Sequence, residues 1–252
     1  MKPVYFISDI HLGAPALSKD FETKRRKEVL RFLDEVVGNG SRLIVVGDLF
    51  DFWYEYKYVI PKNYFWLYAK LKEVVESGIP VDYVAGNHDF FLGEFFSESI
   101  GARVYQDGFS EEINGKKFLI IHGDGLAKKD SGYRMLKGIL RNGFVRTLIR
   151  WVHPDIGFFL AKAFSKKSRE YTSNKDFGET DDMMSFAEKK IGEGYDFVVM
   201  GHNHVPRCEK FSRAGSSIGT GVYINLGDWL KNFTYGIFDG DTMRLMNWEM
   251  EA

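Results

Sequence analysis

The chain has 252 residues, of which 44% are hydrophobic, and its formal net charge at pH 7 is −1. The length fits one large domain or a domain with an insertion, and the apolar fraction excludes a disordered chain. The single cysteine, Cys208, excludes a disulfide framework and a cysteine-based zinc site. Because neither a signal peptide nor a membrane-length apolar run is visible, we expect a cytoplasmic protein.

The charges are unevenly distributed along the chain. Residues 126–175 contain 12 Lys and Arg but only 3 Asp and Glu, a net charge of +9, whereas the remainder carries a net charge of −10. We expect this basic segment to face an anionic partner.

The first half of the sequence alternates strand patterns with helix patterns. Short runs of β-branched and aromatic residues predict buried strands, and apolar residues at helical spacing predict amphipathic helices. In chain order we expect a strand at 4–7, a helix at 21–37, a strand at 43–46, a helix at 64–76 and a strand at 81–85.

The second half begins with a hairpin signal. Asn114-Gly115 suits a two-residue type I′ turn between two strands. Further strands are predicted at 118–121, 197–200, 222–226, 235–238 and 243–248. We expect the strands at 222–226 and 235–238 to form an antiparallel pair.

The basic segment interrupts this alternation with two predicted helices. Residues 133–152 have a helical period, and Asn142-Gly143 is expected to split the run, since glycine costs about 1 kcal/mol in a helix interior. Pro154 is expected to end the first helix, and Asp155 to cap a second helix that runs through Phe164. We therefore expect an inserted cap at 126–175, with the core formed by 1–125 and 176–252.

Five of the predicted strands end in short polar motifs. These are Asp9-Ile10-His11, Gly47-Asp48, Gly86-Asn87-His88-Asp89, His122-Gly123-Asp124 and Gly201-His202-Asn203-His204. The C-terminal ends of strands form the edge where ligands bind in open α/β sheets. Carboxylate, amide and imidazole ligands without thiolate suit Mn, Fe or Zn. Two such ions polarise a phosphoryl group and activate a bridging water, so the set predicts hydrolysis of a phosphate ester.

Each motif alone has a more ordinary interpretation. A single aspartate after a strand is more often a turn residue or a helix cap, and His122 alone is more often a hydrogen-bonded core histidine. However, five of the six histidines lie in these motifs and only His153 falls elsewhere. Since histidine is the commonest metal ligand, this clustering favours a metal site.

Over most of the chain outside 126–175, the five motifs resemble those of the calcineurin-like metallophosphoesterases. The resemblance implies an α/β fold, a four-layer αββα sandwich of two mixed β-sheets flanked by helices, and a site for two divalent metal ions. It implies one metal held by Asp9, His11, Asp48 and His204, and a second held by Asp48, Asn87, His122 and His202. His88 matches a catalytic histidine that contacts the scissile phosphate without binding metal.

The motif flanks resemble more closely the UDP-2,3-diacylglucosamine pyrophosphatases, through the residues around Gly47–Trp53 and Asn225–Trp229 and through the basic insertion. These enzymes release UMP and lipid X from an acylated UDP-sugar in lipid A synthesis. They use Mn²⁺ and lie at the inner face of the cytoplasmic membrane. The resemblance implies the same reaction, metal and location here, although close members have arginine where this chain has His88.

The same resemblance implies a set of substrate-binding residues. These are Asn87, His88, Asp130, Ser168, Thr172, Lys175 and His202, with Thr172 standing where the pattern has an amide. A lysine such as Lys175 can bind a phosphate through a charge-assisted hydrogen bond. A basic amphipathic cap also fits an anionic membrane surface, and the resemblance makes that surface an expected partner.

Three other interpretations remain open. The basic insertion is compatible with a nucleotide or nucleic-acid phosphodiesterase, because it would track a phosphate backbone. Its aromatic residues lie with leucines rather than in a stacking platform, which disfavours a nucleic-acid partner. A scaffold protein without activity usually loses ligands, and none is lost here. Finally, the insertion would be purely structural if its apolar face packed on the core.

Overall fold

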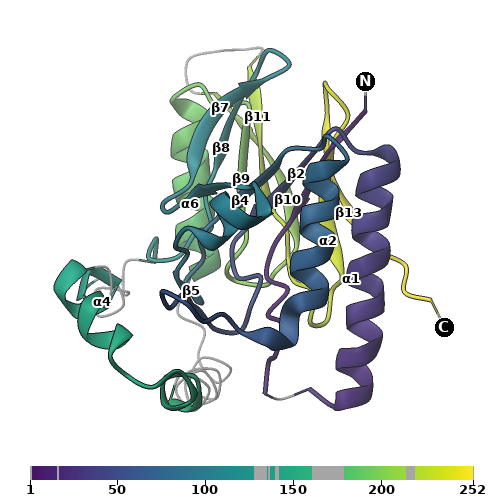
Figure 1. Cartoon of the computed structure of the whole chain (residues 1–252). Coiled ribbons are helices and arrows are strands. Elements are labelled where there is room, and N and C mark those ends of the chain that lie inside the picture. Colours follow the sequence, from purple (N-terminus) through teal and green to yellow (C-terminus); the bar gives the residue numbers. More distant parts are fainter. Residues whose placement is uncertain are drawn as a thin grey trace.

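Two β-sheets lie face to face in this protein, with helices on both outer sides (Figure 1). The computed structural model describes residues 2–15, 17–127, 135, 137–139, 142–160, 179–213 and 219–251.

The first sheet has six strands in the order β13-β12-β1-β2-β4-β6. The four strands β1, β2, β4 and β6 are parallel, whereas β12 is antiparallel to both of its neighbours. The strands are β1 (Val4–Ile7), β2 (Arg42–Val46), β4 (Val81–Val84), β6 (Arg103–Tyr105), β12 (Thr234–Phe238) and β13 (Met243–Asn247). All residues of β1, β2 and β4 are buried, as expected for parallel strands covered on both faces.

The second sheet has five strands in the order β10-β11-β9-β8-β7. They are β7 (Phe109–Ile113), β8 (Lys116–Ile120), β9 (Phe197–Met200), β10 (Arg207–Ser212) and β11 (Thr220–Asn225). The predicted type I′ hairpin is confirmed between β7 and β8, since Asn114 and Gly115 have φ angles of 51° and 74°. A separate two-stranded parallel sheet pairs β3 (Trp53–Tyr54) with β5 (Asp89–Phe91).

Three apolar cores separate the four layers. One lies between the first sheet and the helices α1 (Lys19–Asn39) and α2 (Phe65–Glu76), and it includes Phe32. A second core, with Phe118, lies between the two sheets. A third, with Met183, lies between the second sheet and α6 (Glu179–Gly192). The expected αββα sandwich is therefore confirmed, and Figure 1 shows α1 and α2 on the side opposite α6.

Two shorter helical elements complete the helical layer on the first sheet, and helix α1 of this layer is capped at its N-terminus by a serine side chain. The elements are η1 (Lys62–Tyr64) and η2 (Phe95–Ile100). At the start of α1, the Ser18 hydroxyl accepts a hydrogen bond of 3.2 Å from the Phe21 backbone N–H. This cap satisfies one of the free donors of the first turn, so the helix begins slightly earlier than its apolar pattern predicts.

The predicted pairing of 222–226 with 235–238 is wrong. Strand β11 lies between β10 and β9, whereas β12 lies between β13 and β1 in the other sheet. Ile224 and Phe238 both project into the core between the sheets, so the two strands face each other across the sandwich instead of sharing a ladder. An alternating apolar pattern identifies the buried face of each strand but does not identify its partner.

Residues 142–160, which we call the projecting segment, extend away from the body of the protein near β5 (Figure 1). Its first helix is α4 (Gly143–Arg150), and Asn142 Oδ1 accepts the Phe144 N–H at 3.0 Å. The predicted break at Asn142-Gly143 is therefore confirmed.

The cap expected at Asp155 is wrong, because residues 154–160 are already helical. His153 precedes this helix instead. Its carbonyl oxygen accepts the Gly157 N–H at 3.0 Å, and its Nδ1 accepts the Asp155 N–H at 3.3 Å. Pro154 occupies the first helical position, where its missing N–H costs nothing.

The projecting segment contacts the small β3–β5 sheet and exposes most of its large apolar residues. Phe158 packs edge-on against Phe52 with ring centroids 5.3 Å apart, and the Arg150 guanidinium lies 5.5 Å from the Phe91 ring centroid. In contrast, Phe144 is 73% exposed and Trp151 is 85% exposed. The alternative in which the insertion buries its apolar face on the core is therefore wrong for these residues. None of the helices in the described ranges combines the length and apolar character of a membrane span.

Candidate metal centre

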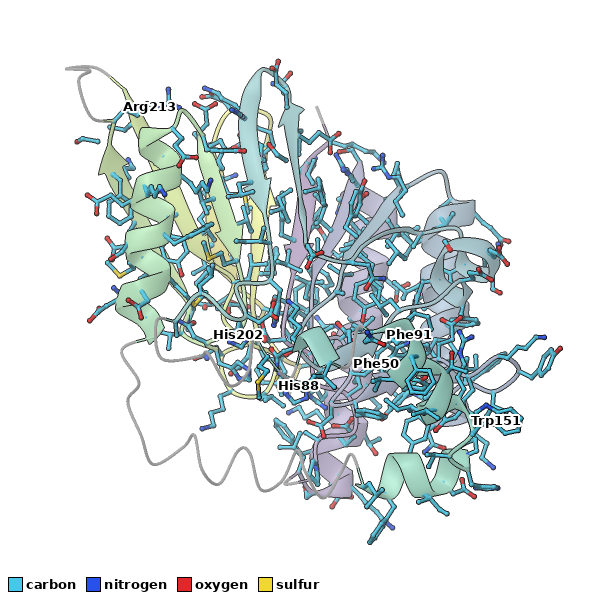
Figure 2. All side chains as sticks on the ribbon, turned by 90° about the vertical axis from the view of Figure 1, so that its left-hand side faces the viewer. Phe50, His88, Phe91, Trp151, His202 and Arg213 are labelled. Atoms are coloured by element: carbon cyan, nitrogen blue, oxygen red, sulfur yellow. The ribbon has the colours of Figure 1, made fainter. Side chains whose placement is uncertain are left out.

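The five polar motifs meet at one end of the sandwich. β1, β2 and β4 of the first sheet and β8 and β9 of the second each deliver their motif where the strand ends. Figure 2 shows His88 and His202 close together at this end, with Arg213 at the opposite end. The residues brought together are Asp9, His11, Asp48, Asn87, His88, His122, His202 and His204.

Much of this site is built from left-handed backbone. The φ angles are 52° at Asp9, 49° at His11 and 52° at Asp48, and they are 75° at His202 and 60° at His204. Each such residue costs about 1–2 kcal/mol relative to ordinary backbone, and it persists only where surrounding contacts offset this cost. Backbone hydrogen bonds between neighbouring loops help to hold these conformations, since the His11 N–H donates to the Asp48 carbonyl oxygen at 2.9 Å.

Glycine is required where two of these loops approach each other. A Cβ atom on Gly86 would lie 2.1 Å from Asp48 Oδ1, and one on Gly47 would lie 2.3 Å from His122 Nδ1. Both distances are far below van der Waals contact. The Gly-Asp and Gly-Asn pairs of the motifs therefore have a steric cause.

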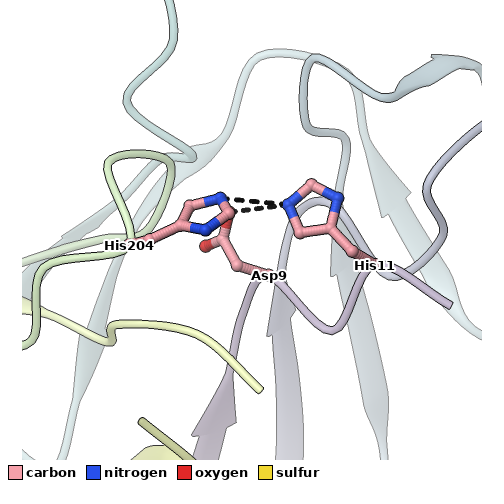
Figure 3. Close-up of side chains that lie close together, drawn as sticks. All are labelled: Asp9, His11 and His204. Atoms are coloured by element: carbon pink, nitrogen blue, oxygen red, sulfur yellow. Dashed lines mark hydrogen bonds and ion pairs between the residues drawn. The ribbon is translucent and has the colours of Figure 1, made fainter. Parts of the chain in front are cut away.

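The first cluster of potential ligands contains Asp9, His11 and His204 (Figure 3). His11 Nε2 lies 3.1 Å from His204 Nε2 and 3.6 Å from Asp9 Oδ1. Asp9 Oδ1 is 3.4 Å from His204 Nε2. Three donor atoms from two distant parts of the chain thus converge on one point.

The second cluster contains Asp48, Asn87, His122 and His202. Asn87 Oδ1 lies 3.0 Å from His122 Nε2 and 2.7 Å from His202 Nδ1. Asp48 Oδ2 is 3.4 Å from His122 Nε2 and 3.6 Å from His11 Nε2 of the first cluster. The Asp48 carboxylate therefore lies between the two clusters.

The residues fit divalent metal ions. The side chains of Asp9 and Asp48 are almost completely buried, and within the described ranges Asp9 Oδ1 has no hydrogen-bond partner. Buried carboxylates without a compensating cation are strongly unfavourable. Hard oxygen donors combined with imidazole nitrogens match first-row divalent ions. The donor set, rather than any single residue, supports this conclusion.

Burial and neighbouring charges set the protonation of the donors. Burial raises the pKa of Asp48, but the adjacent His122 and His88 more than offset this effect and hold the pKa well below its ordinary value. Burial lowers the pKa of His11 to about 4, against the opposing effects of Asp9 and Asp48. At neutral pH, Asp48 is ionised and His11 is neutral, which are the forms that bind metal.

Hydrogen bonds behind the histidines fix which ring nitrogen faces the centre. His122 Nδ1 lies 2.9 Å from the Val46 carbonyl oxygen, and His88 Nδ1 lies 2.5 Å from the Asp51 carbonyl oxygen. Because a carbonyl oxygen only accepts, Nδ1 carries the proton in both rings. In the neutral form of either ring, Nε2 has its lone pair free. Burial lowers the pKa of His122, but Asp48 outweighs this effect and raises the pKa well above its ordinary value, so a metal ion must displace the Nε2 proton of His122.

Asp89 supports the loop that carries Asp48. Its Oδ2 accepts the Asp48 and Gly86 N–H groups at 2.8 and 3.0 Å, and its Oδ1 accepts the Tyr83 hydroxyl at 2.9 Å. Asp89 therefore acts as an acceptor that links the backbone of the Asp48 loop to that of the Gly86 loop.

Asp228 is a residue of this centre that the motif analysis missed. Its Oδ2 lies 3.3 Å from His204 Nδ1, while its Oδ1 accepts three backbone N–H groups, from Leu230, Lys231 and Asn232. An aspartate that orients a metal-binding histidine is a common arrangement. Its signal in the sequence was its position in Asn225–Trp229, a run used above only for a resemblance.

The structure does not test every predicted site residue. Asp130, Ser168, Thr172 and Lys175 lie outside the described residues.

A family model described as Calcineurin-like phosphoesterase matches residues 2–206. The chain belongs to this family. Membership together with the clustered carboxylates and histidines makes this phosphoesterase a metal-dependent phosphohydrolase.

Curated relatives match this phosphoesterase over nearly its whole length. A UDP-2,3-diacylglucosamine hydrolase from Porphyromonas gingivalis is 28% identical, and the alignment covers 98% of this chain and 97% of the relative. One of the same name from Haemophilus influenzae is 29% identical over 92% of this chain and 93% of the relative. A solved structure of Vacuolar Protein Sorting 29 from Cryptosporidium parvum aligns over 98% of each chain, with 15% identity and a TM-score of 0.42.

Proposed function

We propose that this phosphoesterase hydrolyses the pyrophosphate of UDP-2,3-diacylglucosamine, releasing UMP and 2,3-diacylglucosamine 1-phosphate (lipid X). One observation carries the proposal beyond phosphoester hydrolysis. Residues 142–160 form an exposed apolar segment, and in the chain they lie between two motifs of the candidate metal centre, those that begin at His122 and Gly201. A substrate with a charged pyrophosphate and two acyl chains needs both features. The names of the full-length relatives support the same substrate.

The centre would hold two divalent ions, and we propose Mn²⁺. Asp9, His11, Asp48 and His204 would bind one ion, and Asp48, Asn87, His122 and His202 the other. The distances from Asp48 to both clusters support its assignment as the shared ligand. When bound, the ions would supply positive charge to the phosphoryl oxygens and would lower the pKa of a coordinated water.

His88 is the proposed catalytic residue. One of its ring nitrogens, together with His11 and Asp48, belongs to a group of potential ligand atoms that all lie within 4.8 Å of one another. Since its Nδ1 bonds to the Asp51 carbonyl oxygen, Nε2 is the nitrogen available to a phosphate. His88 donates from Nε2 only as the imidazolium, with both nitrogens protonated. In that form it would stabilise the phosphate charge and give a proton to the leaving group.

Residues 126–175 are the proposed cap, inserted into a core formed by 1–125 and 176–252. Within it, Asp130, Ser168, Thr172 and Lys175 are proposed substrate contacts, alongside Asn87, His88 and His202 at the metal centre. The exposed side chains of α4 and the following helix would receive acyl chains, because they offer apolar surface that the core does not use.

We further propose that the cap attaches the protein to the inner face of the cytoplasmic membrane. Exposed aromatic residues of the projecting segment, including Phe144 and Trp151, suit the boundary between the lipid headgroups and the acyl chains of a membrane. The +9 charge of residues 126–175 would add attraction to anionic lipids, at about 1 kcal/mol for each cation near the surface.

The decisive experiment compares acylated and non-acylated substrates. Purified protein should release UMP from UDP-2,3-diacylglucosamine much faster than from UDP-N-acetylglucosamine, EDTA should abolish the reaction, and Mn²⁺ should restore it. Equal rates on the two UDP-sugars would refute the lipid substrate while leaving the hydrolase intact. Salt-sensitive binding and cleavage of DNA or RNA would instead support a phosphodiesterase of nucleic acids.

A further inference from the structure

A helix outside the motifs contacts the turn that carries two of the proposed ligands. Asp9 and His11 both have left-handed backbone, so the shape of this turn depends on what holds its peptide groups. The Asp9 carbonyl oxygen accepts the Trp229 N–H at 3.1 Å. The next two carbonyl groups of the turn, those of Ile10 and His11, point toward α1.

Arg25 of α1 supplies a side-chain donor to each of these two carbonyl groups, and the His11 carbonyl oxygen also accepts the Ala14 N–H at 3.2 Å. Its Nη1 donates to the Ile10 carbonyl oxygen, and its Nη2 donates to the His11 carbonyl oxygen at 3.0 Å. Arg25 is 0% exposed, so its side chain is not an ordinary surface cation. A planar guanidinium presents its donors in fixed directions, which suits two adjacent carbonyl groups better than a single ammonium would.

Glu22, one turn earlier in α1, completes the contact. Its Oε2 accepts from Arg25 Nε at 3.0 Å and from Arg25 Nη2 at 2.5 Å. Its other oxygen, Oε1, accepts the Gly13 N–H at 3.2 Å. The Arg25–Glu22 pair therefore binds two carbonyl groups and one N–H group of residues 10–13.

We propose that Arg25, assisted by Glu22, is a positioning residue for the metal centre. A buried ion pair adds little net stability, so its value here is the shape that it imposes on one turn. Without Arg25 both carbonyl groups lose their guanidinium donor, and the His11 carbonyl oxygen is left with the Ala14 N–H at 3.2 Å. The turn is then held in the left-handed conformation less firmly, by the backbone hydrogen bonds of Asp9 and His11 to the neighbouring loop. The Asp9 and His11 side chains would then no longer converge with His204.

This inference rests on the metal centre of the proposed function but not on its substrate, so metal binding itself is the test. Mn²⁺ binding to the full-length protein is followed by the electron paramagnetic resonance signal of free Mn²⁺, at a temperature where each variant is folded by circular dichroism. We expect Arg25→Gln to raise the Mn²⁺ Kd about 10- to 100-fold, the range found when residues behind metal ligands are lost.

Two further variants keep the test independent of folding. Arg25→Lys retains the charge but not the two-carbonyl fork, and we expect an intermediate Kd. With this variant, kcat should recover at saturating Mn²⁺ while the Mn²⁺ requirement stays higher. Glu22→Ala removes the acceptor of Gly13 from a partly exposed position, and it should also raise the Kd.

The matched control is Arg31→Gln in the same helix. Arg31 also pairs with a glutamate three residues earlier, Glu28, but it contacts the chain terminus through Glu251 instead of the metal turn. Its Mn²⁺ Kd should equal that of the wild type. Folded Arg25→Lys and Glu22→Ala proteins with wild-type Kd would overturn the positioning role. Wild-type protein that binds no Mn²⁺ would overturn the metal centre as well.

Discussion

The Nε2 atoms of His11 and His204 face each other at 3.1 Å, although 193 residues separate the two histidines in the chain. His11 follows β1 of the first sheet, and His204 follows β9 of the second. Each sheet therefore contributes one imidazole to the same point. The packing of the two sheets against each other determines whether this half of the centre exists.

Removal of the Asp48 carboxylate, which lies between the two clusters, should cause the largest loss of catalytic activity. Asp48→Ala should lower kcat on a chromogenic phosphodiester by about 100-fold or more, because residues behind the ligands already cost 10- to 100-fold. The variant should also bind less Mn²⁺ in the titration described above. Wild-type turnover by folded Asp48→Ala protein would exclude the shared-ligand assignment.

A methyl group at Gly86 should displace the Asp48 carboxylate although the substitution replaces none of the proposed ligands. In Gly86→Ala the new Cβ would lie 2.1 Å from Asp48 Oδ1 and 2.6 Å from the Asp48 backbone nitrogen, so the carboxylate must move. We expect a loss of phosphodiesterase activity that added Mn²⁺ restores only in part.

Gly38→Ala is the control for this substitution. Gly38 lies in α1, and apart from the adjoining helix backbone no atom of the described residues lies within 4 Å of the position that its Cβ would take. Activity should be unchanged, and stability should rise by about 0.5–1 kcal/mol in urea unfolding. Equal activity of the two alanine variants would contradict the steric argument.

Asp228 should make stability depend on pH in the acid range. Burial raises the pKa of Asp228, but the hydrogen bond with His204 and the backbone N–H groups of Asn232 and Lys231 outweigh it and lower the pKa to about 2. An unfolded aspartate has a pKa of about 3.9. Since the folded pKa is the lower one, the carboxylate stabilises the fold above about pH 4, and this contribution is lost as the pH falls toward 2.

The measurement is urea unfolding of EDTA-treated protein. At about pH 7, Asp228→Asn should be less stable than the wild type by about 2–3 kcal/mol, which corresponds to a shift of nearly two pKa units. The difference should shrink at about pH 3. A difference that stays constant over this range would show that the ionised form of Asp228 has no special role.

The exposed aromatic residues of the projecting segment should contribute to the binding of lipid membranes and of the acylated substrate, but not to the hydrolysis step itself. Replacing both Phe144 and Trp151 by serine should weaken binding to vesicles that contain anionic lipid and slow hydrolysis of the acylated substrate. Hydrolysis of a soluble chromogenic phosphodiester should remain unchanged, because neither residue is part of the centre. Stability should change little, since both side chains are already largely in water.

Phe65→Ser provides the comparison for this double variant. Phe65 is 72% exposed at the start of α2, on the surface of the two-sheet domain and outside the projecting segment. The Phe65→Ser variant should bind vesicles as the wild type does. Loss of vesicle binding by Phe65→Ser to the same extent would indicate a general effect of surface apolarity instead of a specific face.

The strand-end motifs could be read from the sequence because local rules govern them. An apolar run followed by Gly47-Asp48 or by Gly86-Asn87 marks the end of a buried strand, and the structure brings those ends together. The partners of β11 and β12 could not be predicted, because the alternation of apolar residues in each strand shows only which of its faces is buried.

The residues behind the ligands were not predictable for a different reason. Arg25 lies in an amphipathic helix, where an arginine is normally a solvated side chain, and its contacts to Ile10 and His11 arise only from tertiary packing. The His153 cap was missed because aspartate is the more usual capping residue. Local sequence preferences do not encode either contact.

The left-handed residues of the centre set a limit on transplanting it to another protein. Copying the side chains of Asp9, His11, Asp48, His202 and His204 onto the strand ends of an unrelated sheet would reproduce the chemical groups but not their directions. A host protein would also need loops that hold aspartate and histidine at positive φ, with glycine where the loops nearly touch. The portable unit is therefore a set of interlocked turns, and the ligands come with them.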